Sequence, residues 1–128
     1  MEKTKILIVD DSELILAKIS DVLEAEGYTV FSTSTAGDAF GEVMRKKPDV
    51  LLLDIMMPGI DGIEICSKLK KNSLTKDIAI VIYSGKKDVE LMDLCFAAGA
   101  DNYVLKSSDT SLLTKTIKDI VKQKSILY

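Results

Sequence analysis

The chain has 128 residues, 47% of them hydrophobic, which is enough apolar material for one packed domain. Its 17 basic and 20 acidic residues give a net charge of −3, so charge offers no reason to expect binding to nucleic acid. The chain contains no histidine, which excludes Ser-His-Asp catalysis, Cys-His catalysis and imidazole metal sites.

The two cysteines, Cys66 and Cys95, form no CxxC pair and suggest no disulfide framework, so a reducing cytoplasm is the expected location. Both lie on predicted helices, where a small buried hydrophobic residue is favoured over a redox role. No signal peptide is visible, because the apolar run at residues 6–9 is short and leads into acids. The longest apolar stretch, residues 78–83, is far shorter than the roughly 20 residues of a membrane helix, so no membrane association is expected.

Short apolar runs alternate with amphipathic stretches along the chain. The runs are rich in Val and Ile and predict strands at residues 5–9, 28–33, 49–54, 78–84 and 102–105. The stretches between and after them predict helices at residues 13–26, 36–46, 63–71, 88–98 and 109–123. This alternation predicts a doubly wound α/β fold, with a parallel sheet covered by helices on both faces. No linker or repeat interrupts it, so residues 1–128 are expected to form a single domain; the segment after Lys122 is either a frayed helix end or the start of a linker.

Polar residues follow the carboxyl ends of four predicted strands. Because parallel strands end at one edge of a sheet, where ligands of such folds bind, we expect these residues to lie close together. They are Asp10 and Asp11 after the first strand, Asp54 after the third, Ser84 and Gly85 at the end of the fourth, and Lys106 after the fifth. Taken singly, each has a simpler interpretation as a helix cap, a turn residue or a solvated lysine.

Three converging carboxylates repel one another, since two unit charges about 4 Å apart cost about 4 kcal/mol at an effective dielectric constant near 20. A hard cation such as Mg²⁺, which prefers carboxylate oxygens, would offset this repulsion. Together with the ammonium of Lys106 and the hydroxyl of Ser84, such a site suits a phosphoryl group. A carboxylate can itself attack phosphorus and form an aspartyl phosphate.

The order and spacing of four motifs resemble the receiver domain of two-component response regulators, over essentially the whole chain. The motifs are DD at 10–11, LLLDIMMPGIDG at 51–62, SG at 84–85 and AGADNYVLK at 98–106. The resemblance implies a flavodoxin-like sheet in the order 2-1-3-4-5 with five helices. It also implies a phosphorylation-dependent signalling switch of a His-Asp phosphorelay, rather than an enzyme with a separate substrate. The implied phosphodonor is a sensor histidine kinase or a histidine phosphotransfer protein, which fits the missing histidine.

The resemblance further implies roles for individual residues. Asp54 would be the phosphoacceptor. Mg²⁺ would be held by Asp10, Asp11, Asp54 and the backbone carbonyl of Met56. Ser84, the backbone of Gly85 and Lys106 would contact the phosphoryl group, Ser84 and Tyr103 would form the conformational switch, and Pro58 and Gly62 match the loop after the acceptor.

The chain departs from the family pattern after the lysine. Ser107 follows Lys106, where the family usually has a proline preceded by a cis peptide bond. A cis bond to a non-proline residue costs about 3–4 kcal/mol, so either the surrounding structure holds this strain or the bond is trans and the lysine approaches differently. Met56 and Lys86 occupy positions that tune the phosphoryl lifetime in this family. Neither can orient an attacking water, which predicts a long-lived phosphoryl group.

The predicted helix at 88–98 carries apolar residues around an arc wider than the roughly 100° that one buried face requires. Either the helix is deeply packed, or Met92 and Phe96 form a second apolar edge beside Tyr103. By the resemblance, the second interpretation predicts a surface of helix 4, strand 5 and helix 5 that binds an output partner or a second copy of the chain.

Two other interpretations of the chain remain. A pseudo-receiver that works without phosphate is opposed by the intact acid pair and Lys106, although Ser107 keeps it open. A metal-dependent phosphohydrolase would need a substrate pocket, and the sequence shows no lid or substrate-binding insertion. Direct nucleic-acid binding is not expected, because no DNA-binding segment is visible in the 128 residues.

Overall fold

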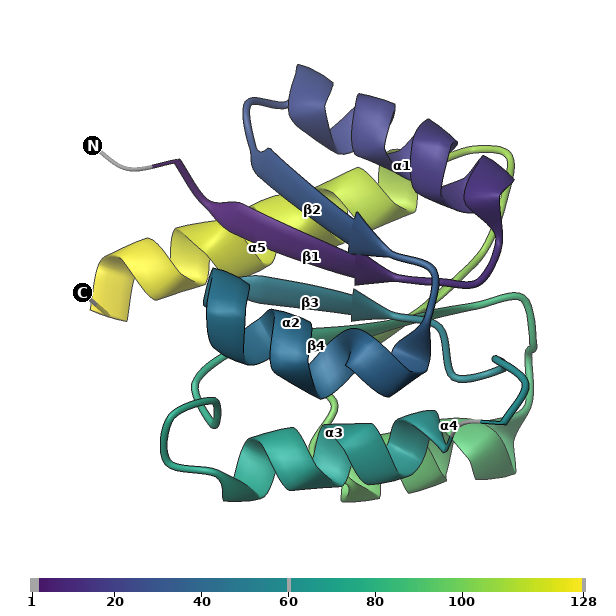
Figure 1. Ribbon diagram of the computed structural model, residues 1–128. Helices are drawn as coiled ribbons and strands as arrows, with labels where there is room; N and C mark the ends of the chain where they lie inside the picture. The colour runs from purple at the N-terminus through teal and green to yellow at the C-terminus, as the bar shows by residue number, and fades with distance from the viewer. Residues whose placement is uncertain (1–2, 60, 128) are drawn as a thin grey trace.

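Five parallel strands form one sheet in the order β2-β1-β3-β4-β5, which confirms the predicted topology (Figure 1). The computed structural model describes residues 3–59 and 61–127. The strands are β1 (Lys5–Val9), β2 (Thr29–Thr33), β3 (Val50–Leu53), β4 (Ala79–Ser84) and β5 (Asn102–Leu105). Each predicted strand is present, with bounds that differ by at most one residue at either end.

Five α-helices lie among the described residues and cover both faces of the sheet (Figure 1). They are α1 (Glu13–Ala25), α2 (Ala39–Lys46), α3 (Gly62–Lys71), α4 (Val89–Ala97) and α5 (Ser111–Leu127). Helices α1 and α5 pack on one face, and α2, α3 and α4 pack on the other. None of the helices in the described part of the chain is both long and apolar enough to cross a bilayer.

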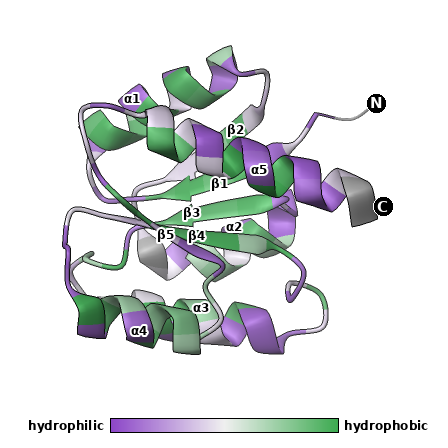
Figure 2. Ribbon diagram, turned by 180° about the vertical axis from the view of Figure 1, so that it is seen from behind, coloured by the Kyte–Doolittle hydropathy of each residue, from purple (hydrophilic) through white to green (hydrophobic). Residues whose placement is uncertain are grey.

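The strands are buried on both faces, and this explains why they read as continuous apolar runs rather than as alternating ones. Every residue of β3 and of β4 is buried. Alternate side chains divide into two layers: Leu51 and Leu53 pack toward α2, α3 and α4, whereas Val50 and Leu52 pack toward α1 and α5. Figure 2 shows the central strands β1, β3 and β4 mainly in the hydrophobic colour and the helices around them in mixed hydrophobic and hydrophilic colours.

Two predicted helices differ from the structure by more than one residue at an end, and the other three differ by at most one. The helix predicted at 36–46 begins as a short 3-10 helix (Ala36–Asp38) and becomes α-helical at Ala39. The helix predicted at 109–123 starts two residues later, because the Asp109 side chain accepts hydrogen bonds from the Ser111 backbone and hydroxyl in the preceding turn. It continues to Leu127, so its predicted end at residue 123 is wrong, and the segment after Lys122 is helical to that point.

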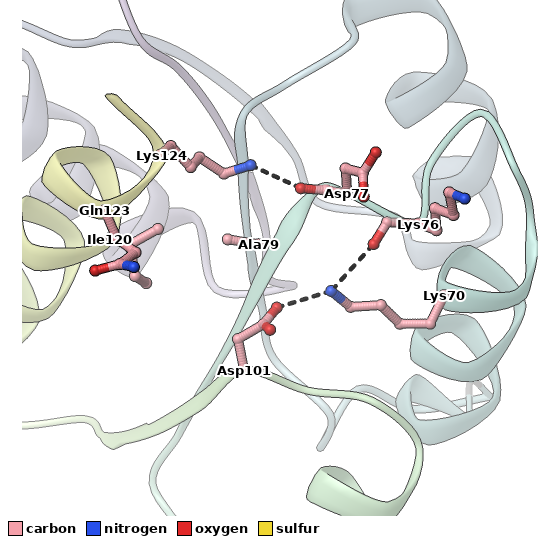
Figure 3. A pocket seen from close by; sticks show the side chains of 8 residues that line it. All are labelled: Lys70, Lys76, Asp77, Ala79, Asp101, Ile120, Gln123 and Lys124. Atoms are coloured by element: carbon pink, nitrogen blue, oxygen red, sulfur yellow. Dashed lines mark hydrogen bonds and ion pairs between the residues drawn. The ribbon is translucent and has the colours of Figure 1, made fainter. Parts of the chain in front are cut away.

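The amino ends of β4 and β5 are held by a partly exposed ionic contact (Figure 3). The Asp101 carboxylate accepts hydrogen bonds from the Ile80 backbone N–H and the Lys70 ammonium, both at 2.8 Å. The Lys70 ammonium also donates to the carbonyl of Ile78 at 2.9 Å. A pocket lies beside this contact, but its Lys70 and Lys124 amines are already bonded within the protein. We therefore interpret this end of the sheet as structural.

Candidate functional site

The register of β1 and β3 places two acids side by side at the carboxyl end of the sheet. Val9 pairs with Leu53, so the next residues, Asp10 and Asp54, leave adjacent strands together. The strand ladder continues one step further, because the Asp54 N–H donates to the Val9 carbonyl at 2.9 Å. Asp10 is 1% exposed and Asp54 is 5% exposed, so the buried strands carry both carboxylates to a largely desolvated position.

Asp11 completes a cluster of three carboxylates. Oxygens of Asp10, Asp11 and Asp54 all lie within 4.8 Å of one another, with Asp11 exposed and the other two buried. One oxygen of each buried acid is occupied by a backbone donor: Ser12 N–H donates to Asp10 Oδ1 and Met56 N–H to Asp54 Oδ1, both at 2.9 Å. The Oδ2 atoms of the two buried acids are therefore the ones available for other chemistry.

The ammonium of Lys106 lies between the two buried acids. Its Nζ is 2.8 Å from Asp10 Oδ2 and 3.2 Å from Asp54 Oδ2. Burial by itself lowers the pKa of Lys106, but the two carboxylates outweigh this effect and hold the pKa above its usual value. The lysine side chain is therefore protonated at neutral pH, and its charge offsets part of the repulsion within the acid cluster.

The backbone around Lys106 resolves the alternative that Ser107 left open. The peptide bond between Lys106 and Ser107 is trans. The Lys106 N–H donates to the Ser84 carbonyl at 2.8 Å, which extends the β4–β5 ladder by one residue. A trans loop therefore suffices to bring the lysine side chain to both acids.

The donor set fits a hard divalent cation. Although Asp10 Oδ2 is close to Lys106, the direction of approach is not that of a hydrogen bond, and this buried oxygen has no aligned donor. An orphaned carboxylate oxygen beside two further carboxylates is the donor chemistry that Mg²⁺ prefers. The structure shows the Met56 amide bonded to Asp54, while a role for the Met56 carbonyl as a ligand stays a prediction.

Ser84 contacts both the backbone of Lys106 and the loop after β4. The residue is fully buried, and its hydroxyl oxygen accepts a hydrogen bond from the Lys86 N–H at 3.2 Å. The Lys86 carbonyl in turn accepts a hydrogen bond from the Tyr103 hydroxyl. A continuous path therefore runs from Ser84 through one loop residue to Tyr103. Gly85 is exposed, and a Cβ built on it would meet no atom within 4 Å.

Helix α4 is not deeply packed, which removes one of the two interpretations of its wide apolar arc. Cys95 is the buried residue of this helix. Val89 is 71% exposed, Leu94 56% and Phe96 46%, whereas Met92 is half-buried. The helix therefore presents apolar side chains to solvent, although the structure shows no partner for them.

The sequence reasoning missed Tyr83, which precedes Ser84 and lies next to the site. Its ring centroid is 6.0 Å from Lys106 Nζ. The alternation of side chains along β4 could have indicated the position of Tyr83, because it places Tyr83 and Ser84 on opposite faces of the sheet at the same reactive edge.

Comparisons with known proteins point to one family. The sequence profile described as response regulator receiver domain matches residues 6–118. The chain is 34% identical to the phosphate regulon transcriptional regulatory protein PhoB of Pseudomonas aeruginosa, over 92% of the chain and 52% of PhoB. It is also 34% identical to the protein PilH of that organism, over 91% of the chain and 97% of PilH. The chain thus spans about half the length of PhoB and of several other curated relatives, but nearly all of PilH.

Solved structures agree with this result. The response regulator TrrA of Thermotoga maritima, determined in complex with Mg²⁺ and BeF, superposes with a TM-score of 0.82 at 31% identity. The match covers 91% of this chain and 98% of TrrA. The same fold therefore occurs in a relative that was solved with Mg²⁺.

Proposed function

The chain belongs to the response regulator receiver domain family, and from this premise we propose that it is a phosphorelay switch in which Asp54 accepts a phosphoryl group. Receiver domains are signalling switches rather than enzymes acting on a separate substrate. The observation that carries the proposal is the position of Asp54 Oδ2. This oxygen belongs to a buried carboxylate, lies 3.2 Å from the Lys106 ammonium and is part of the three-acid cluster.

The proposed reaction is a displacement at phosphorus. An Asp54 oxygen forms a bond to the phosphorus of the donor, and the bond from phosphorus to the donor's leaving atom breaks. With a phosphohistidine donor, the leaving atom is an imidazole nitrogen, which takes the bonding electron pair and then a proton. The donor that we propose is a sensor histidine kinase or a histidine phosphotransfer protein, which agrees with the absence of histidine from these 128 residues.

Three features of the chain support charge stabilisation during this transfer. The Lys106 ammonium is held in place by Asp10 and by the β5 backbone, so it is positioned before the phosphoryl group arrives. The Ser84 hydroxyl and the exposed backbone at Gly85 are candidate donors to phosphoryl oxygens. Asp10, Asp11 and Asp54, with the Met56 carbonyl, are the residues that would hold Mg²⁺, which when bound neutralises charge on the transferring oxygens.

The proposed switch uses the path from Ser84 to Tyr103. If the Ser84 hydroxyl turns to a phosphoryl oxygen, its hydrogen bond with the Lys86 N–H weakens. The carbonyl of Lys86 is also the acceptor for the Tyr103 hydroxyl. Phosphorylation would in this way change the loop after β4 and the surface next to it. The output surface that we propose is the exposed apolar part of α4 with Phe96 and Met92, beside Tyr103 and α5. Its partner is an output protein or a second copy of the chain.

Intact-protein mass spectrometry tests the phosphoacceptor. Incubation with a small acyl phosphate and Mg²⁺ should add one phosphoryl group to the wild type and none to Asp54→Ala. Absence of any gain in the wild type would support a pseudo-receiver instead, and continuous release of phosphate from phosphoesters would support a hydrolase.

Paired substitutions test the output surface. Met92→Ser with Phe96→Ser should abolish phosphorylation-dependent dimerisation or partner binding without reducing phosphorylation of Asp54. Leu74→Ser is a matched control, because Leu74 is also exposed but lies in the turn between α3 and β4, outside the proposed surface. Unchanged association in the double variant would remove this surface from the proposal.

A further inference from the structure

Strand β2 forms one edge of the sheet, so half of its backbone faces away from the other strands (Figure 1). Among the described residues it pairs with β1 alone. The Thr33 carbonyl accepts a hydrogen bond from the Asp10 N–H at 3.2 Å, which turns the backbone groups of the odd-numbered residues of β2 toward β1. Because these groups alternate in direction along a strand, the N–H and C=O groups of Val30 and Ser32 point to the free edge.

A basic pocket lies along this edge. It is open, has a volume of about 490 Å³ and includes no acid among its described lining residues. Four of the six residues that line it are cations, and they come from the start of the chain, from β1 and from the last turn of α2. The lining residues are Lys3, Lys5, Thr29, Phe31, Arg45 and Lys46.

Most of this positive charge is not neutralised within the described part of the chain. Arg45 is paired with an acid of its own helix. Lys3, Lys5 and Lys46 take part in none of the ion pairs found among the described residues. The nearby Asp49 carboxylate accepts the backbone N–H of Lys5 at 2.8 Å, and not its ammonium. The pocket is therefore a positive region on a chain whose net charge is −3.

The two faces of the sheet differ in chemistry at this edge. The pairing of β1 with β2 places Lys5 and Phe31 on the face that α2 covers, where the Lys46 ammonium lies 4.9 Å from the Phe31 ring centroid. Val30 points to the opposite face and packs against the layer under α1. Side chains of a strand added here would alternate between the cations and this apolar layer.

We infer that the free edge of β2 binds an extended segment of a partner protein, with acidic and apolar side chains at alternate positions. The backbone groups of Val30 and Ser32 would pair with the segment, and the basic pocket would select its charge. A second copy of the chain fits poorly, because its own β2 edge carries the same cations and they repel. The surface includes none of the residues of the acid cluster, so the inference does not depend on the proposed function.

Fluorescence anisotropy with a labelled peptide of about seven residues, alternating Glu and Val, tests the binding. The peptide should bind, and its affinity should fall roughly tenfold between low and moderate salt. A peptide of the same composition with its Glu residues grouped together should bind several-fold more weakly, and one of alternating Lys and Val should not bind. No binding of the alternating acidic peptide at about 1 mM, or equal binding of all three peptides, would overturn the inference.

Hydrogen exchange of the wild type, followed by NMR, tests the backbone pairing. Saturation with the alternating acidic peptide should slow exchange of the Val30 and Ser32 amides roughly tenfold or more, whereas the Phe31 amide, which faces β1, should change little. Unchanged exchange at Val30 and Ser32 would overturn the inference. Ser32→Pro removes one outward N–H at a position where an edge strand tolerates proline, and it should weaken binding several-fold. Ser32→Ala keeps the N–H and is the matched control.

Charge substitutions test the selectivity of the pocket. Lys5→Gln with Lys46→Gln should weaken binding of the acidic peptide roughly tenfold and reduce its salt dependence. Lys68→Gln with Lys71→Gln is the matched control, because it removes the same charge from α3, outside the pocket. Equal binding by the two double variants would overturn the inference, as would self-association of the wild type that Ser32→Pro abolishes. Asp54→Ala should bind the peptide like the wild type, so a failure of the proposed phosphotransfer leaves this result unaffected.

Discussion

Replacing Lys106 by methionine removes the one cation that contacts both buried acids in the described site. Its Nζ lies 2.8 Å from Asp10 Oδ2 and 3.2 Å from Asp54 Oδ2. At an effective dielectric constant near 20, each contact is worth about 5–6 kcal/mol of Coulomb energy. The net loss of stability is smaller than this Coulomb energy for two reasons. The lysine side chain is 21% exposed, and the methionine variant has no ammonium to desolvate on folding. Loss of one partner of such a cluster should therefore lower the free energy of unfolding by roughly 2–4 kcal/mol.

Urea unfolding followed by circular dichroism, in EDTA and in excess Mg²⁺, measures this effect. In EDTA the variant should be less stable by the amount above. It should gain more stability from Mg²⁺ than the wild type does, because the ammonium no longer competes for the carboxylates.

Lys115→Met provides the matched control for the urea experiment. Lys115 forms an exposed ion pair with Asp119 at 3.4 Å, so its loss should change stability by less than about 0.5 kcal/mol. Equal stabilities of the two variants in EDTA, or equal gains from Mg²⁺ in Lys106→Met and the wild type, would refute the reasoning.

Three further predictions concern the loop after β3, a buried thiol and the phosphoryl lifetime. In Gly62→Ala, the new Cβ would lie 2.9 Å from a backbone atom of that loop, so unfolding measurements should show a loss of roughly 1–3 kcal/mol, with Gly37→Ala as an unhindered control. Burial raises the pKa of Cys66 from 9.0 to about 11, so the folded state keeps a proton that the unfolded state loses. Its contribution is complete below pH 9 and is lost as the pH rises toward 11. Relative to Cys66→Ala, the wild type should lose on the order of 1 kcal/mol between pH 8 and pH 10, and parallel pH profiles would contradict this. Because neither Met56 nor Lys86 can orient water, phosphate loss should be slow in Mg²⁺ and should speed up in Lys86→Glu; rapid loss from the wild type would count against the prediction.

The position of the acid cluster could be predicted from the sequence because it follows from chain connectivity. An apolar run that ends at Leu53 must be a buried strand, and the next residue, Asp54, must then emerge at the edge where parallel strands end. The same argument places Asp10, because β1 is a neighbouring strand of the same kind. Burial pattern and the alternation of strands and helices are local properties, so they predict the fold class and the edge that carries the carboxylates, whereas the strand order was implied by the resemblance to the family.

The tertiary structure alone decided how that edge is held together. Lys106 contacts Asp10 even more closely than Asp54, and nothing in the spacing of these residues indicates this, because a long side chain on a loop can reach several partners. The Tyr83 ring centroid likewise lies 6.0 Å from Nζ of Lys106, a residue 23 positions later in the sequence that is brought close only by the pairing of β4 and β5. Hydrophobic periodicity reports which side of an element is buried. Distances between side chains of different strands are set by packing of the whole domain, and they became visible only in the folded chain.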